Sequence, residues 1–546
     1  MPKAAKAKTP NLHQLAQERF GYDKLYPGQE RAVQAVLAGH DTLAVMPTGS
    51  GKSAIYQLAA YMMPGATVVV SPLMALQRDQ AQAIAQQDVG EATVINSSLS
   101  AAEREEGFAA WESGTSEFLF LAPEQFNQSE TLERLRSAKP SLFVIDEAHC
   151  ISAWGHDFRP DYLRLGQVIE ALDHPRILAL TATAAPPVRD EIVQRLNMKK
   201  PEVIVEGFDR PNIFLAVHRV QDEAEKQEAL VKQVMQSAKP GIVYAATRKR
   251  TEEIATLLQE QGIQAEHYHA GLKHDDRGAI ETRFMTDEIE VLVATTAFGM
   301  GVDKPNVRFV FHADISDSVD SYYQEFGRAG RDGEAAQAIL FYNTDDLKLR
   351  RFFASKTRIE PEHVEQVAEV LQNQDEPVDP KDLAEQLDLS KAKLKATLQR
   401  LAEAEAIELT PTGEVVAGGL EDTSTAAEAA IAAQERRQNF ERSRLEMMRG
   451  YAEVRDCRRK YLLNYFGEAF EAPCDYCDSC RAGVVVEESD RQPFPIASRV
   501  AHKSWGEGEV MRYEGDKIVV LFEQVGYKTL GIDVVLFRDL LRPVAD

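Results

Sequence analysis

Short apolar runs alternate with longer helical segments through the first 350 residues. Five runs between Thr42 and Phe214 are expected to be buried strands: Leu43–Met46, Thr67–Val70, Phe118–Leu121, Leu142–Ile145 and Ile177–Leu180. A second series follows it: Pro240–Tyr244, Gln264–His267, Val291–Ala294, Arg308–His312 and Ala338–Tyr342. Uninterrupted apolar strands separated by helices are typical of a parallel, doubly wound sheet. The pattern predicts two tandem α/β domains, 1–210 and 211–355, with a site in the cleft between them.

The pattern changes after about residue 356. Three helices are expected at Glu360–Asn373, Pro380–Leu387 and Ser390–Glu405, with Ser390 as the N-cap of the third. Ala406–Val416, which contains Pro-Thr-Gly, is expected to form a hairpin. Three helices and a hairpin in residues 356–420 predict a winged helix.

The remaining chain divides into a helical part and a β part. A long helix, Thr423–Arg455, leads into a cysteine cluster, and together they form an expected helical module, 421–483. Polar residues with two prolines indicate a linker at 484–496. Four short strands then predict a small β-barrel at 497–546: Arg499–His502, Gly508–Tyr513, Lys517–Phe522 and Tyr527–Ile532.

Length and composition are those of a folded protein with several domains. The chain has 546 residues, of which 44% are hydrophobic and 27% charged. It has no run of about 18 apolar residues, so we expect no membrane span. The Lys-rich start, 1–10, lacks the apolar core of a secretory signal. We therefore expect a cytoplasmic protein.

The net charge of −24 lowers the expectation of a nucleic-acid partner without excluding one. Net charge governs solubility and steering, whereas binding depends on a locally basic groove. The acidity does predict weak binding of nucleic acid at high salt, because few phosphates would be neutralised.

A phosphate-binding loop is expected where the first predicted strand ends. Met46-Pro-Thr-Gly-Ser-Gly-Lys-Ser53 follows that strand and opens a helix. Thr48, Gly49, Ser50 and Gly51 would surround the phosphates with backbone N–H groups, Lys52 would neutralise them, and Ser53 would ligate Mg²⁺. Met46 stands where the motif usually has glycine or alanine. A glycine-rich turn with a purely structural role is the alternative, and the Lys-Ser that follows makes it improbable. The expected ligand is ATP.

Two acidic residues follow another predicted strand. Asp146 and Glu147 begin Asp-Glu-Ala-His and would face the crevice at the carboxyl ends of the strands. We expect Asp146 to hold Mg²⁺ through water and Glu147 to deprotonate the attacking water. The alternative is that these residues are only a surface charge cluster. The position of the acidic motif, about 90 residues after the phosphate loop, argues against this alternative.

The second α/β domain ends in a motif with two arginines, Gln324-Glu-Phe-Gly-Arg-Ala-Gly-Arg-Asp-Gly333. We expect Arg328 and Arg331 to share a helix face and to stabilise the charge that develops on the γ-phosphoryl group. Surface arginines are common, so this motif alone would be weak evidence for a nucleotide site, and the other two motifs support that interpretation. Together the three motifs predict an ATP-driven motor in which the two domains close on the nucleotide.

Four of the five cysteines lie close together. Cys457, Cys474, Cys477 and Cys480 have a spacing typical of a metal site in a cytoplasmic chain. Cys150 stands alone and is expected to be a small buried thiol.

In this order the motifs resemble the RecQ DNA helicases of the second helicase superfamily. The resemblance implies two RecA-like domains and Zn²⁺ in a closed, structural four-cysteine site. It also implies that Gln29 reads the adenine edge, that Tyr22 stacks on the base, and that Gln324 belongs to the ATP site. Where the family has arginine before Pro-Gly-Gln, this chain has Tyr26.

Asp146–Pro160 resembles the aromatic-rich loop of the family, which couples single-strand binding to ATP hydrolysis. Trp154 and Phe158 can stack on bases, and Arg159 can contact phosphate. Core packing is the alternative for the two aromatics, and the intervening Gly-His-Asp argues against it. The resemblance implies a 3′-5′ DNA helicase that unwinds duplex DNA, moves along single-stranded DNA, acts in repair or recombination, and is nucleoid-associated.

Two departures from the family leave roles open. The predicted winged helix stands between the motor and the zinc module, and no counterpart of the family's usual winged helix is expected in 481–546. Residues 502–530 resemble the Tudor-like barrel of UvrD-type helicases, which implies a protein or nucleic-acid partner. The inserted domain is either a duplex-binding element or a spacer or protein-binding module. An RNA helicase and a scaffold protein without catalysis remain rival functions.

Overall fold

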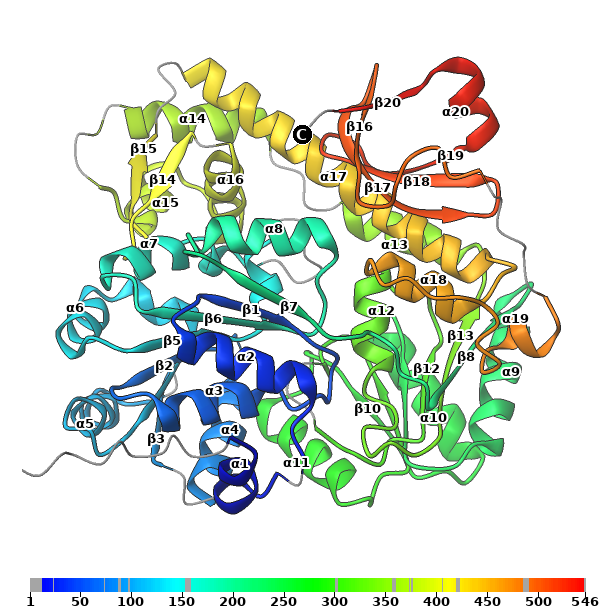
Figure 1. The fold of residues 1–546 in the computed structure, drawn as a ribbon, viewed down its shortest axis with the longest axis horizontal. Coiled ribbons are helices and arrows are strands. Elements are labelled where there is room, and N and C mark those ends of the chain that lie inside the picture. Colours follow the sequence, from blue (N-terminus) through cyan, green and yellow to red (C-terminus); the bar gives the residue numbers. More distant parts are fainter. Residues whose placement is uncertain are drawn as a thin grey trace, which may run out of the picture. The chain divides into compact units, whose positions relative to one another are not determined.

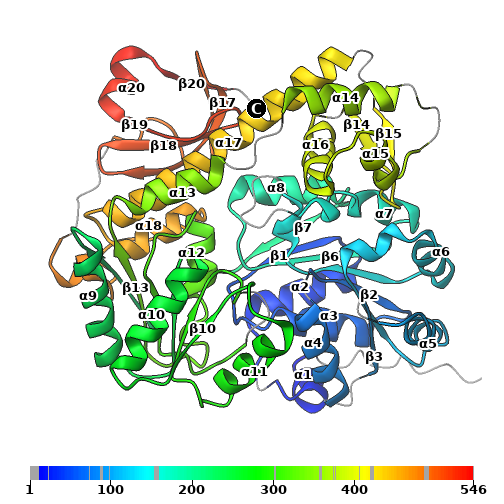
Figure 2. The same ribbon diagram turned by 180° about the vertical axis from the view of Figure 1, so that it is seen from behind.

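Parallel β-strands form the larger sheets of the chain (Figures 1 and 2). The computed structural model describes residues 12–22, 24–72, 74–86, 90–96, 99–152, 159–299, 303–355, 360–372, 374, 377–404, 406–418, 423–484 and 491–544. These divide into two compact units. The first contains residues 1–182, 188–206 and 410–414, and the second contains residues 183–187, 207–409 and 415–546.

The first unit contains a parallel sheet in the order β3-β4-β2-β5-β6-β1-β7. Its strands are β1 Thr42–Val45, β2 Thr67–Val70, β3 Ala92–Ile95, β4 Phe118–Leu121, β5 Leu142–Ile145, β6 Arg176–Thr181 and β7 Glu202–Val205. Its helices are α1 Leu12–Phe20, α2 Pro27–Ala38, α3 Ser53–Met62, α4 Met74–Gln86, α5 Ala101–Glu112, α6 Ser129–Ala138, α7 Leu165–Ala171 and α8 Pro186–Arg195. Short 3₁₀ helices lie at Pro123–Asn127, Ala148–Ile151 and Pro160–Tyr162.

The five strands predicted in this unit are confirmed, each to within one residue at either end. The two strands that the pattern missed, β3 and β7, lie at the edges of the sheet. Their side chains are mostly half-buried or exposed, whereas β1, β2, β4 and β5 are wholly buried. Both strands contain apolar residues, Val94-Ile95 and Val203–Val205, but neither is buried along its whole length.

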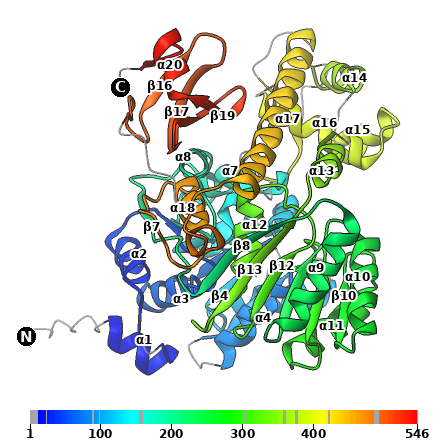
Figure 3. The same cartoon turned by 90° about the vertical axis from the view of Figure 1, so that its right-hand side faces the viewer.

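The second unit contains a parallel sheet in the order β10-β11-β9-β12-β13-β8. Its strands are β8 Ile213–Arg219, β9 Gly241–Tyr244, β10 Ala265–Tyr268, β11 Val291–Ala294, β12 Phe309–His312 and β13 Ala336–Tyr342. Its helices are α9 Glu223–Gln236, α10 Arg248–Glu260, α11 His274–Met285, α12 Val319–Phe326 and α13 Asp346–Ser355. Figure 3 shows β8, β13 and β12 side by side. All five predicted strands are present, and β8, again an edge strand, was missed.

Three helices and a two-stranded sheet follow, as the pattern predicted for the winged helix. They are α14 Pro361–Gln372, α15 Pro380–Gln386, α16 Lys391–Glu403, β14 Ile407–Leu409 and β15 Val415–Ala417. The Ser390 hydroxyl accepts from the Lys393 backbone N–H at 3.3 Å and caps α16, as expected. Their buried apolar side chains share one core with Ala426, Ala427 and Ala430 of the next helix.

That next helix, α17 Thr423–Glu453, runs from these elements to the cysteine cluster (Figure 3). Two short helices, α18 Arg458–Tyr465 and α19 Asp478–Arg481, carry or flank the cysteines. The last part is an antiparallel sheet in the order β19-β18-β17-β16-β20, here called the C-terminal sheet. Its elements are β16 Arg499–His502, β17 Gly506–Glu514, β18 Lys517–Phe522, β19 Gly526–Gly531, α20 Ile532–Arg538 and β20 Leu541–Pro543.

The C-terminal sheet has its own apolar core, formed by residues such as Val500, Val520 and Phe522. Its four predicted strands are present, and α20 and β20 were not foreseen. Within the described residues, no helix has the length and apolar character needed to cross a membrane.

Candidate nucleotide and zinc sites

The glycine-rich loop lies between the carboxyl end of β1 and the start of α3. Gly49 and Gly51 have φ values of 81° and 69°, in the left-handed region that favours glycine. The Lys52 ammonium donates to the Met46 and Pro47 carbonyls at 3.3 and 3.5 Å, so it lies over its own loop. The first turn of α3 begins at Ser53, and the positive end of the helix dipole there is suited to an anion.

The Gln29 amide is bonded to the same loop. Its Nε2 donates to the Ser50 and Gly51 carbonyls at 2.7 and 3.0 Å, and its Oε1 accepts from the Tyr26 N–H at 2.9 Å. The Tyr22 hydroxyl donates to Gln57 at 2.8 Å, and its ring stacks on Phe20. In this structure the Gln29 amide therefore supports the phosphate loop, a contact that the sequence did not reveal.

Asp146 and Glu147 lie at the carboxyl end of β5, near the loop. Strand β6 pairs with both β5 and β1, so all three parallel strands end at one edge of the sheet. The Asp146 carboxyl is buried, and its pKa is raised to about 7 by burial first and by the Glu147 charge second. The nearby Lys52 ammonium lowers that pKa in part, so the two motifs act on each other electrostatically.

Glu147 is held in an unusual conformation next to a buried histidine. Its φ is 50°, a left-handed value that costs energy for a residue other than glycine and is concentrated at functional sites. Nδ1 of His149 lies 3.3 Å from a Glu147 carboxylate oxygen and 2.8 Å from the Thr181 hydroxyl. Thr181 ends β6, so this histidine joins the acidic motif to the strand between β5 and β1.

Arg328 and Arg331 lie in the second unit, in turns that follow α12. The prediction that they share a helix face is wrong, because α12 ends at Phe326. Arg331 Nη1 contacts Asp303 at 2.5 Å. Burial and the positive charge of Arg328 lower the pKa of Arg331, and Asp303 opposes this effect. Two buried guanidinium groups that repel each other form a site suited to a polyanion.

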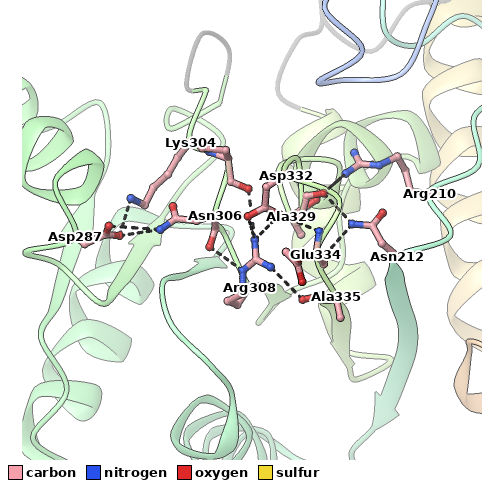
Figure 4. A network of polar contacts seen from close by, with 12 residues as sticks. Arg210, Asn212, Asp287, Lys304, Asn306, Arg308, Ala329, Asp332, Glu334 and Ala335 are labelled. Atoms are coloured by element: carbon pink, nitrogen blue, oxygen red, sulfur yellow. Dashed lines mark hydrogen bonds and ion pairs between the residues drawn. The ribbon is translucent and has the colours of Figure 1, made fainter. Parts of the chain in front are cut away.

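A network of side chains fixes the backbone of this arginine turn (Figure 4). The Arg210 guanidinium donates to the Gly327, Ala329 and Gly330 carbonyls at 2.8 to 3.1 Å. Asn212 Nδ2 donates to the Gly330 and Glu334 carbonyls, both at 2.8 Å.

The next residue after the turn is held in the same network. Arg308 pairs with both Asp332 carboxylate oxygens at 2.7 and 2.6 Å (Figure 4). Sequence reasoning missed Arg210 and Asn212, because they contact carbonyls about 120 residues away, and neither lies in a recognised motif.

The four predicted metal ligands come together. The Sγ atoms of Cys457, Cys474, Cys477 and Cys480 all lie within 4.8 Å of one another. Cys457 and Cys477 are N-caps of α18 and α19, and their sulfurs accept backbone N–H groups at 3.5 and 3.4 Å. Four cysteine sulfurs at this separation fit a tetrahedral zinc ion, because four thiolates so close together need a shared cation.

A second group of metal-ligand types, Glu252, His267 and His269, fits metal binding poorly. Nδ1 of His269 accepts the Gly271 N–H at 3.2 Å, so a neutral ring carries its proton on Nε2. That nitrogen lies 3.0 Å from Glu252 and donates to it. His269 therefore forms a hydrogen-bonded pair with Glu252.

The predicted DNA-binding residues are only partly visible. Trp154 and Phe158 lie outside the described residues. Arg159 is half-buried, and its Nη1 donates to the Pro72 carbonyl at 3.0 Å.

Family models cover much of the chain. Residues 26–192 match the DEAD/DEAH box helicase model, 225–333 the helicase conserved C-terminal domain, and 420–481 the RecQ zinc-binding domain. A probable ATP-dependent DNA helicase, RecS of Bacillus subtilis, is 39% identical over 67% of this chain and 73% of its own. ATP-dependent DNA helicase RecQ of Pasteurella multocida is 36% identical over 84% of this chain and 61% of its own.

Two solved helicase structures share the fold at low identity. DUF1998 helicase MrfA bound to DNA has a TM-score of 0.53 at 19% identity, covering 78% of this chain and 60% of its own. DEAD-box helicase Mss116 has the same TM-score at 17% identity, covering 79% and 88%. These likenesses show the fold alone, with two RecA-like, parallel-sheet domains. The chain belongs to the RecQ family of ATP-dependent DNA helicases, with zinc-binding cysteines and DNA as partner.

Proposed function

We propose that this helicase hydrolyses ATP at the phosphate loop and the Asp146–Glu147 pair, and that hydrolysis drives 3′-5′ movement along single-stranded DNA. The observation that carries the proposal is that β5, β6 and β1 run side by side and parallel, so the acidic pair and the phosphate loop follow strand ends at one edge of the sheet. A general base and a phosphate clamp at one sheet edge suit phosphoryl transfer to water.

The chain's own groups have distinct tasks in this scheme. Backbone N–H groups of Thr48–Ser53 bind the phosphates, and Lys52 leaves the Met46 and Pro47 carbonyls to neutralise them. Glu147 accepts a proton from the attacking water, and Nδ1 of His149 lies 3.3 Å from its carboxylate. Ser53 and Asp146 would hold Mg²⁺, which would neutralise charge on the phosphate oxygens.

The arginine turn completes the site when the second domain approaches. Arg328 and Arg331 stabilise the negative charge that develops during transfer, and Gln324 contributes to nucleotide binding. Arg210 and Asn212 keep the turn rigid, so little reorganisation is needed at the moment of reaction. Domain closure on ATP and opening after hydrolysis then become steps along the strand.

We assign DNA contact to Trp154, Phe158 and Arg159, which would stack on bases and bind phosphate. Gln29 and Tyr22 would recognise the adenine base, and Gln29 would exchange a bond to the loop for one to the base. Zinc at the four cysteines stabilises the fold of the module around them. We place the protein in the cytoplasm, at the nucleoid, in DNA repair or recombination.

The C-terminal sheet is proposed to dock a protein partner. Val534, Leu536 and Phe537 of α20 are large apolar side chains exposed by 49%, 49% and 89%. Exposed apolar side chains that gather on one short helix are typical of an interaction surface.

The proposed catalytic residues are tested by ATP hydrolysis with and without single-stranded DNA. Lys52→Ala and Glu147→Gln should each lower kcat by about 10²- to 10³-fold or more. Matched RNA should stimulate hydrolysis less than DNA. Full activity in both variants would overturn the assignment, and equal stimulation by RNA would remove the preference for DNA.

A further inference from the structure

A buried ion pair holds the start of α12, the helix that leads into the arginine turn. Asp320 lies in its first turn, and the Arg444 guanidinium of α17 approaches its Oδ2 at 3.3 Å. Both side chains are only 8% exposed. Arg444 also donates to the Ser318 hydroxyl at 2.7 Å, and Ser318 caps α12. One guanidinium group thus holds both the cap and the first turn.

A third group completes this node. The Tyr465 hydroxyl of α18 donates to the same Asp320 oxygen at 2.5 Å. A buried carboxylate is costly unless it is paired and hydrogen-bonded, so Arg444 and Tyr465 together determine where Asp320 can lie. The helix that precedes the arginine turn is therefore fastened to both α17 and α18, the helices of the zinc-binding region.

The C-terminal sheet forms the next layer. The Tyr527 ring of β19 lies 5.7 Å from the Tyr465 ring and 6.1 Å from the Phe440 ring of α17, and Tyr527 is only 4% exposed. A Cβ on the neighbouring Gly526 would lie 2.2 Å from the Ser443 hydroxyl oxygen. Strand β19 therefore packs directly on α17, as close as a glycine allows.

A second contact fastens the sheet to the same region. The Arg512 guanidinium of β17 is buried 4.6 Å from the centre of the Tyr461 ring of α18, and it approaches the Met447 sulfur of α17 at 3.3 Å. Its charge is paired with Glu514 at 2.6 Å. The C-terminal sheet thus meets both helices that hold Asp320.

We propose that Asp320 is a positioning residue for the arginine turn, and that the C-terminal sheet, through Tyr527, belongs to the unit that fixes it. This proposal rests on the proposed role of Arg328 and Arg331 in ATP hydrolysis. Asp320 and Gln324 are four residues apart and lie on one face of α12, so a shift of the first turn moves the residues that follow. The sheet then tunes hydrolysis, besides any partner that it docks.

The test uses full-length variants and two ligands of the nucleotide site. Asp320→Asn removes the charge, and Tyr465→Phe removes one hydroxyl and keeps the ring that faces Tyr527. The matched control is Tyr513→Phe, which deletes a phenol that bonds to the Phe494 backbone within the C-terminal sheet. Affinities are measured for ADP and for ADP with fluoroaluminate, a mimic of the transition state, alongside kcat for ATP.

Both test variants should lose about 10- to 100-fold in kcat and in affinity for the fluoroaluminate complex, with unchanged affinity for ADP. Partial unfolding would weaken the apparent affinities for both ligands by the same factor, so a loss of stability alone does not separate the fluoroaluminate complex from ADP. Tyr527→Leu should give a smaller loss of the same kind, and Tyr513→Phe none. The positioning role would be overturned if Asp320→Asn and Tyr465→Phe each bind ADP and the fluoroaluminate complex with the affinities of wild type.

If Tyr527→Leu keeps wild-type kcat and affinities while Asp320→Asn and Tyr465→Phe lose them, the C-terminal sheet does not belong to the positioning unit. The proposed function has a separate test in Arg331→Ala. If Arg331→Ala retains full hydrolysis, the arginine assignment itself fails. If Arg331→Ala is inactive while Asp320→Asn behaves as wild type, only the present inference fails.

Discussion

The raised pKa of Asp146 predicts that binding of the magnesium nucleotide releases a proton near neutral pH. The carboxyl is buried beside Glu147, and these two effects raise its pKa to about 7 against the partial opposition of Lys52. Without nucleotide, the group is therefore largely protonated below pH 7. A magnesium ion favours the ionised carboxylate, so binding displaces the proton.

The size of the effect follows from that pKa. A group with a pKa of about 7 carries ~0.9 proton at pH 6, ~0.5 at pH 7 and ~0.1 at pH 8. These fractions are the protons released by Asp146 when binding lowers its pKa well below 6. Below pH 7, the affinity contributed by this carboxylate should weaken by about tenfold for each pH unit.

Isothermal titration calorimetry measures the released protons. Magnesium ADP is titrated into the protein at each pH in two buffers with different ionisation enthalpies. The nucleotide's own phosphate also releases protons on binding, so the same titration with Asp146→Asn is subtracted. Asparagine keeps the size of the side chain and cannot titrate.

The reasoning is refuted if wild type and Asp146→Asn release equal numbers of protons at pH 6 and bind measurably. It is equally refuted if the difference between them grows as the pH rises from 6 to 8. Either result would mean that burial does not hold the Asp146 proton in the nucleotide-free protein.

Three further outcomes are expected. Because the pKa of Asp146 is raised by about three units, the folded first domain binds more protons than the unfolded chain between about pH 4 and 7 and loses stability as the pH rises. Asp146→Asn should thus raise its free energy of unfolding at pH 8 by up to about 4 kcal/mol, as measured in urea. Zinc analysis should find about one ion per chain, and removal of zinc by a chelator or Cys477→Ala should unfold the zinc-binding region, seen as protease sensitivity. Asn212→Ala leaves the Gly330 and Glu334 carbonyls without this donor, so the free energy of unfolding should fall by about 1–3 kcal/mol. The same variant should lower kcat for ATP more than it changes the affinity for ADP.

The sequence predicted the interiors of both sheets, because a strand buried on both faces needs an unbroken apolar run. It missed three of the four edge strands, β3, β7 and β8, and found the fourth, β10. The phosphate loop, the acidic pair and the cysteines were predictable for a related reason. Their chemistry requires residues close together in sequence, or at a fixed spacing, next to a strand or helix end.

The supporting residues were not predictable in this way. Arg210 reaches a turn more than a hundred residues away, and Asp320 meets Arg444 and Tyr465 only after the helices pack. Gln29 shows a second limit, because its motif indicated a base contact while its amide bonds the phosphate loop. Long-range polar contacts depend on packing, and no local pattern encodes them.

The central claim is that ATP hydrolysis at Lys52, Asp146 and Glu147 drives unwinding of DNA from a 3′ single strand. Strand displacement on matched 3′-tailed and 5′-tailed duplexes, with ATP and Mg²⁺, tests it most directly. Wild type should unwind the 3′-tailed duplex well and the 5′-tailed duplex poorly, and Glu147→Gln should bind the same DNA without unwinding it. Unwinding by Glu147→Gln at the wild-type rate, or a wild type that hydrolyses ATP and separates neither duplex, would contradict the claim.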